Sequence, residues 1–177
     1  MKKLIAGLCA TGILVVIFGT IYGAVQQAQR SDANYPQIQI AEDTAAGLNR
    51  GDPPLLVANP NVNIATSLAP FTIIYDKKGG VFLSSGYLNN KAPKAPLSML
   101  EDSKGKTYNA VTWQPQKGVR IASVTVAAKD YYVLSGRSLT EVEKNENHTL
   151  QIALIGGILS VILLGIAIIV KVLGTEY

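Results

Sequence analysis

The stretch that decides the fold is residues 71–86, which read FTIIYDKKGGVFLSSG. Residues 71–75 are all β-branched or aromatic, the types that are enriched in strands. Residues 76–80 form a turn, because glycine accepts the positive φ angle that a tight hairpin requires. Residues 81–83 then return as a second strand. The stretch therefore predicts a β-hairpin, and this hairpin lies in the middle of a chain whose two ends are apolar.

Two long apolar runs bracket the hairpin. Residues 4–25 contain no ionisable side chain except Cys9 and Tyr22, and residues 150–170 contain none. Each run reaches the roughly 20 helical residues that cross the hydrocarbon core of a bilayer. A run of this length in lipid satisfies its backbone hydrogen bonds only as a helix. We therefore expect two transmembrane helices.

A cleaved signal peptide is the alternative interpretation of the first run, because Met1-Lys2-Lys3 makes a positive start. The apolar part is longer than the roughly 7–15 residues of a typical signal peptide. No clean cleavage site with small residues follows it. We therefore expect an uncleaved anchor.

The cations predict the orientation of the chain. Lys2 and Lys3 precede the first run and Lys171 follows the second, so the positive-inside rule predicts cytoplasmic termini at the cell membrane and an extracytoplasmic segment 31–149. These three lysines carry most of the net charge of +4. The basic pI is therefore no argument for nucleic acid. Because the single cysteine, Cys9, falls in the first span, the outer segment has no disulfide.

Between the two runs the sequence predicts an α+β domain with about five antiparallel strands. Residues 107–114, 119–127 and 131–136 add three strands to the hairpin. Apolar residues occupy both alternating sets of 119–127, so this strand is expected to be central and covered on both faces. A short helix is expected at 97–103, capped by Ser98.

The boundaries of the predicted segments follow from these patterns. The first span and its extension are expected to break near Tyr35-Pro36. Ser138, with Glu141 at the third position, is expected to cap a helix that runs without a break into the second span. The segments are the first span with its extension (1–30), an irregular or helical entry segment (31–67), the sheet domain (68–137), a juxtamembrane helix (138–149), the second span (150–173) and a short cytoplasmic tail (174–177).

Two sets of residues resemble a known family. The hairpin 75–81 followed by Ser84-Ser85-Gly86, and the later segments 119–122, 132–134 and 136–139, are similar to PAS-like or Cache-type extracytoplasmic sensor domains of bacterial two-span receptors. The resemblance covers residues 68–172 and implies a PAS-like antiparallel sheet whose last strand passes into a juxtamembrane helix. It also implies a transmitter after the second span, where this sequence has only residues 171–177. A sensor of this kind is therefore expected to act through a partner protein.

A small-molecule site is expected on the later strands of a PAS-like sheet. Its candidate residues are Trp113, Arg120, Tyr132 and Arg137. Arginine would pair with a carboxylate ligand through its planar guanidinium, and the aromatic rings would wall the pocket.

The alternative interpretation of these four residues is structural. Trp113 and one tyrosine would then belong to the core, and the two arginines would pair with acids such as Asp130 or Glu141. The sequence alone does not say which face of each strand points inward.

Small residues in the apolar runs predict helix packing, because they allow close approach where lipid offers no hydrophobic driving force. These residues are Gly12, Gly19, Gly23, Gly156 and Ser160. They can support the packing of the two spans on each other, the formation of a homodimer, or the binding of another membrane protein. Membrane lipid is the remaining partner expected of such spans.

No catalytic or metal-binding constellation is visible, so neither an enzyme nor a cofactor is expected. His148 is the only histidine, and a metal site requires several donors. The function expected from the sequence is a membrane-anchored extracytoplasmic sensor or binding domain that acts through a partner. The alternative is a non-catalytic accessory subunit of a larger membrane protein complex.

Overall fold

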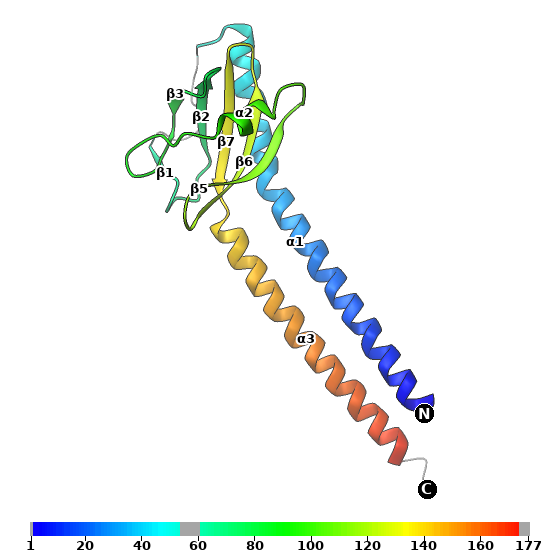
Figure 1. Ribbon diagram of the computed structural model, residues 1–177. Helices are drawn as coiled ribbons and strands as arrows, with labels where there is room; N and C mark the ends of the chain where they lie inside the picture. Colours follow the sequence, from blue (N-terminus) through cyan, green and yellow to red (C-terminus); the bar gives the residue numbers. More distant parts are fainter. Residues whose placement is uncertain (1, 54–60, 174–177) are drawn as a thin grey trace. The chain divides into compact units, whose positions relative to one another are not determined.

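The computed structural model describes residues 2–53 and 61–173, so the predicted tail at 174–177 lies outside the described residues. The chain divides into two units. The first, Met1–Gln29 with Lys144–Tyr177, is called the span unit after the two predicted spans, and the second, Arg30–Glu143, is called the sheet unit. Figure 1 follows the elements along the chain. In chain order they are α1 (Lys2–Arg50), β1 (Val62–Asn63), β2 (Phe71–Asp76), β3 (Val81–Ser84), β4 (Gly86–Tyr87), α2 (Leu97–Glu101), β5 (Asn109–Gln116), β6 (Val119–Ala127), β7 (Tyr131–Ser138) and α3 (Thr140–Leu173).

Both terminal helices are long and apolar enough to cross a membrane. Their apolar side chains face outward: Val16 of α1 is 67% exposed and Leu163 of α3 is 65% exposed. The core helix of a soluble domain would bury such residues. The two predicted apolar helices that flank the sheet are therefore confirmed, and their surfaces suit a lipid environment.

Helix α1 does not break where the sequence predicted it. It continues through Pro36 to Arg50, so the expected break near Tyr35-Pro36 is wrong. Proline removes one backbone hydrogen bond and crowds the preceding turn. Beyond Pro36, however, the helix buries a row of residues spaced four apart, Gln37, Ala41 and Ala45, in the sheet unit. This burial holds the helix together across the proline.

The C-terminus of α1 is closed by a glycine. Gly51 adopts φ +87°, its N–H donates to Leu48 O at 3.1 Å, and the N–H of Asp52 donates to Gly47 O at 3.0 Å. This pair of bonds is the Schellman motif, which satisfies the last carbonyl groups of a helix.

The five-stranded antiparallel sheet predicted from the sequence is confirmed, with strand order β3-β2-β7-β6-β5. Strand β6 has the predicted bounds and is buried along most of both faces. A second, two-stranded parallel sheet joins β1 and β4 and was not predicted. The sheet therefore has β7 at its centre, and β7 leads directly toward α3.

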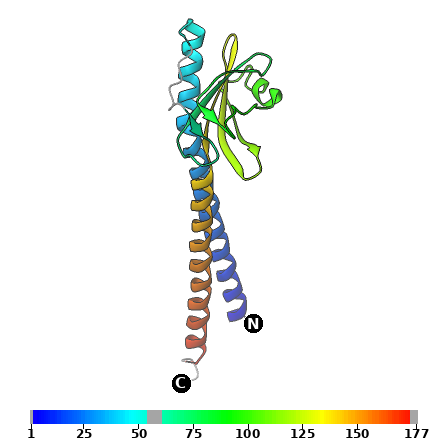
Figure 2. The same cartoon turned by 90° about the vertical axis from the view of Figure 1, so that its left-hand side faces the viewer.

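Each face of the sheet is covered by a different part of the chain. On one side, which we call the α1 face, Ala41 and Ala45 of α1 pack against Val124, Val126 and Val133. On the other side, which we call the α2 face, Leu100 of α2 joins the largest core cluster of the sheet unit. Figure 2 shows the C-terminal part of α1 and the short helix α2 on opposite sides of the sheet. The sheet is thus the middle layer of three.

The predictions made for the start of helix α2 and for helix α3 have different outcomes in the structure. Helix α2 begins at Leu97, and its N-cap is Pro96 with no side-chain cap bond, so the predicted Ser98 cap is wrong. Ser138 ends β7, and its hydroxyl accepts the backbone N–H of Thr140 at 3.3 Å. From Thr140 the helix runs unbroken to Leu173, which confirms the predicted continuity of the last strand, the helix and the second apolar run.

Candidate functional site

The four residues predicted to form a ligand site lie on two different faces of the sheet. Tyr132 pairs with Ala127 and Trp113 pairs with Ile121, which places both aromatic residues on the α2 face. Arg137 pairs with Ala122 on the α1 face, and Arg120 lies on that same face because side chains alternate along a strand. The structure therefore does not bring the arginines and the aromatic residues into one pocket.

The two aromatic residues belong to the hydrophobic core. Trp113 is 6% exposed and Tyr132 is fully buried, and both pack in the cluster that includes Leu100 of α2. Lys77 lies over the ring of Tyr132, with its Nζ 4.4 Å from the ring centre, a cation–π arrangement. This matches the structural alternative that the sequence left open for Trp113 and one tyrosine.

The two arginines bind acids of helix α3. Arg120 Nη1 lies 2.5 Å from Glu143 Oε1, and Arg137 Nη2 lies 3.6 Å from Glu141 Oε2. Both glutamates sit in the first turn of α3, where the helix dipole favours negative charge. The two ion pairs therefore join strands β6 and β7 to the start of α3.

Tyr75 of β2 binds the segment that precedes α2 on the α2 face of the sheet. Its hydroxyl donates to Pro93 O at 2.8 Å, and burial raises the pKa of its phenol above the usual range. Because Pro93 lies in the segment that leads into α2, this bond fixes that segment over the sheet.

No protein-family model matches the chain, and no curated protein or solved structure matches it. The function is therefore argued from the geometry of its residues.

The predicted packing glycines of the spans separate into two groups. A Cβ atom at Gly156 of α3 would lie 3.2 Å from Cε1 of Phe18, so this glycine lets the two helices approach each other within the span unit. At Gly12, Gly19 and Gly23 of α1 a Cβ would meet nothing within 4 Å. Ser160 uses its hydroxyl within α3, donating to Gly156 O at 2.7 Å.

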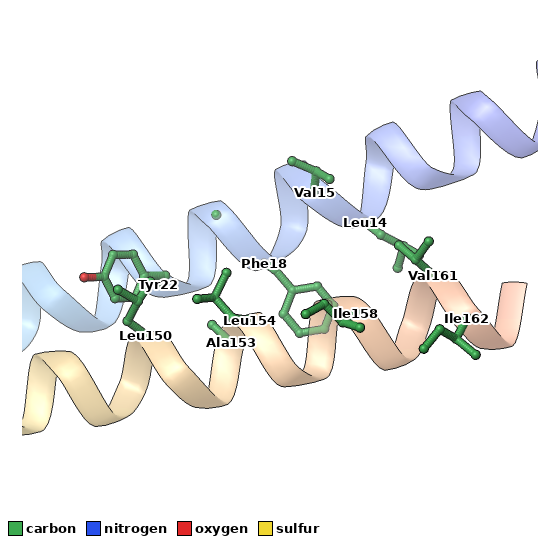
Figure 3. A pocket seen from close by; sticks show the side chains of 12 residues that line it. Leu14, Val15, Phe18, Tyr22, Leu150, Ala153, Leu154, Ile158, Val161 and Ile162 are labelled. Atoms are coloured by element: carbon green, nitrogen blue, oxygen red, sulfur yellow. The ribbon is translucent and has the colours of Figure 1, made fainter.

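A groove runs between the two helices of the span unit. It has a volume of about 500 Å³ and an almost wholly apolar lining that includes Gly19. Figure 3 shows the ring of Phe18 reaching from α1 toward α3 beside Ile158, with the other lining side chains along both helices. The helices thus meet at Phe18, as they also do where Gly7 faces Ile168, and they leave apolar surface uncovered beside the Phe18 contact.

A second pocket lies in the sheet unit, and the sequence did not predict it. It is lined mainly by asparagines of the β1 and β4 regions. The sequence signals at this pocket are the asparagines at 61 and 63 and the Asn89-Asn90 pair, which indicate turns as much as binding. Among the residues that the structure describes, no cluster of three or more His, Cys, Asp or Glu side chains could hold a metal ion.

Proposed function

We propose that the chain is a non-catalytic accessory subunit of a membrane protein complex, anchored at the cell membrane by α1 and α3. The positions of Lys2, Lys3 and Lys171 favour cytoplasmic termini and an outer domain at 31–149. The partner is another membrane protein that packs on α1, and lipid contacts the remaining surface of both spans.

The observation that carries the proposal is the open glycine surface of α1. Gly12, Gly19 and Gly23 have no neighbour that a Cβ would touch, whereas the chain's own contacts between the two helices lie at Gly7 and Gly156. In lipid, helices associate by close packing over small residues. A row of small residues on α1 whose space no side chain of this chain fills is what a subunit needs in order to bind a partner helix.

The sheet unit supports a docking or scaffolding role. Both faces of the sheet are filled by the chain's own side chains, from α1 on one face and from α2 on the other. The arginines that a carboxylate ligand would need are already paired with Glu141 and Glu143. In a domain packed in this way, the outer surface is more accessible to a partner protein than the faces of the sheet are to a small-molecule ligand.

The test is native mass spectrometry of the full-length protein released from its own membranes in mild detergent. We expect a second polypeptide in fixed stoichiometry, and we expect Gly12→Leu with Gly19→Leu to release it. Gly165→Leu is the matched control, because a Cβ there also meets nothing within 4 Å but lies on α3. A monomer of the wild-type chain would overturn the proposal, and a homodimer would make the partner a second copy.

The second candidate function is a PAS-like sensor that acts through a partner. It is favoured by the hairpin β2–β3 and by the way β7 passes into α3, as the family resemblance implies. The pairs Arg120–Glu143 and Arg137–Glu141 would transmit a shift of the sheet to α3. Such coupling requires a ligand that distinguishes two conformations. A small bound mass in the native spectrum that is lost in Arg120→Ala would favour this function over the first.

A further inference from the structure

The asparagine pocket of the sheet unit is built by two short segments that the parallel pair β1–β4 holds side by side. Val62 N–H donates to Ser85 O at 2.7 Å and Ile64 N–H donates to Tyr87 O at 3.0 Å. The pocket has a volume of about 460 Å³, within the roughly 300–1,000 Å³ typical of ligand sites. Its lining consists of Asn61, Asn63, Ala65, Tyr87, Asn89 and Asn90.

The lining carries hydrogen-bonding groups but no ionisable group other than the phenol of Tyr87. Each asparagine amide offers an acceptor oxygen and a nitrogen with two donors. An anion or a cation would find no counter-charge among the lining residues. The chemistry fits a neutral ligand that both donates and accepts hydrogen bonds at several points.

Two of the amides are held in fixed orientations. Asn63 Oδ1 accepts the backbone N–H of Ala65 at 3.1 Å, so its nitrogen is left to donate. Asn89 Nδ2 donates to Gln116 Oε1 at 3.0 Å, so its oxygen is left to accept. A donor of Asn63 and an acceptor of Asn89 are therefore held in place before a ligand binds, which lowers the cost of binding.

The backbone gives these asparagines a structural role as well. Asn61, Asn89 and Asn90 have φ angles of 65°, 53° and 61°, and Asn89-Asn90 forms the tip of a tight turn closed by two bonds between Leu88 and Lys91. Turn formation explains why these positions tolerate asparagine or glycine. It does not require asparagine at all three, nor a tyrosine beside them.

We propose that this pocket binds a neutral sugar ring. Sugar hydroxyl groups donate and accept hydrogen bonds in the alternation that the amides provide, and Tyr87 supplies an aromatic surface for the C–H groups of the ring. The ring of Tyr87 is anchored, because its hydroxyl donates to Ser84 O at 2.9 Å. The site is distinct from the glycine surface of α1 that carries the proposed subunit function, since no residue of α1 or α3 lines it.

The test is saturation-transfer NMR on the full-length protein in a detergent without a sugar headgroup. The probes are the methyl glycosides of glucose, galactose and N-acetylglucosamine. The variant Asn61→Gly with Asn90→Gly removes two amides but keeps the positive φ angles, because glycine adopts them freely. Tyr87→Ala removes the ring, and Tyr108→Ala is its matched control, since Tyr108 is 39% exposed and does not line the pocket.

We expect transfer to at least one glycoside in the wild-type protein. The double glycine variant should weaken this binding by about tenfold, the value of one or two hydrogen bonds. Tyr87→Ala should also weaken it, through loss of the aromatic surface, and Tyr108→Ala should leave it unchanged. Circular dichroism establishes that each variant is folded, and if the double glycine variant unfolds then Tyr87→Ala decides. The absence of transfer to all three glycosides, or transfer that survives both pocket variants, would overturn the proposal.

Discussion

Ser135 at the centre of the sheet donates its hydroxyl hydrogen to Gln37 Oε1 of helix α1 at 2.8 Å. Both side chains are almost fully buried, at 0% and 1% exposure. The bond lies on the α1 face, next to the apolar contacts of Ala41 and Ala45. It gives the docking of α1 a polar contact with a defined geometry, in addition to non-directional apolar packing.

The first prediction follows from this bond. Ser135→Ala leaves the oxygen of Gln37 buried without its donor and should lower the free energy of unfolding by about 1–3 kcal/mol. Gln37→Leu combined with Ser135→Ala removes both polar partners and should be more stable than Ser135→Ala alone. The measurement is denaturant unfolding of the full-length chain in micelles, followed by the fluorescence of Trp113, the only tryptophan. Additive losses in the double variant would mean that the two side chains do not act as a pair.

The second prediction concerns Phe71, whose ring packs against two glycines. A Cβ at Gly136 would lie 2.6 Å from Cζ of Phe71, and a Cβ at Gly86 would lie 2.6 Å from its Cδ2. Gly136→Ala should therefore lower the free energy of unfolding by about 1–3 kcal/mol through overpacking. Phe71→Leu should recover part of this loss in the Gly136→Ala background. Gly165→Ala is the control, since a Cβ there has open space. An unchanged unfolding midpoint in Gly136→Ala would contradict the close packing.

The sheet was predictable because its strands carry a strong local signal. The run FTIIYD and the apolar residues on both faces of β6 give bounds that agree with the structure to within a few residues. Strands β1 and β4 have two residues each, too few for any alternation to be read. The continuation of α1 past Pro36 depends on burial against the sheet, which is a tertiary effect that no local pattern contains.

The candidate ligand residues could not be grouped correctly from the sequence for a related reason. Strand β6 is buried on both faces, so its pattern does not show which face carries Arg120. The register of β6 against β7, with Ala122 opposite Arg137 and Ala127 opposite Tyr132, separates the two arginines from Tyr132. The asparagine pocket was missed because its residues are turn formers, and turn formers are common on surfaces.

The third prediction concerns the ion pairs at the start of α3. The side chains of Arg120 and Glu143 are partly exposed, and exposed pairs contribute only about 0–1 kcal/mol. Arg120→Ala should therefore change the free energy of unfolding by less than about 1 kcal/mol. The double variant with Glu143→Ala, measured by the same fluorescence assay, gives the coupling between the two residues. A loss of several kcal/mol in Arg120→Ala would instead indicate a desolvated pair on which the fold depends.

The last prediction concerns pH and the buried phenol of Tyr75. Burial raises the pKa of Tyr75 above its ordinary value of 10.0, so above about pH 10 the unfolded chain loses this proton while the folded chain keeps it. The folded state then binds more protons, and the free energy of unfolding falls as the pH rises.

Tyr75→Phe removes the titrating group and also the bond to Pro93 O. The variant should be less stable than wild type at pH 8 by about 0.5–1.5 kcal/mol, and this difference should shrink between pH 10 and 11. Tyr108→Phe, at an exposed tyrosine, should follow the wild-type pH dependence. A difference between Tyr75→Phe and wild type that stays constant from pH 8 to pH 11 would show that Tyr75 ionises equally in both states.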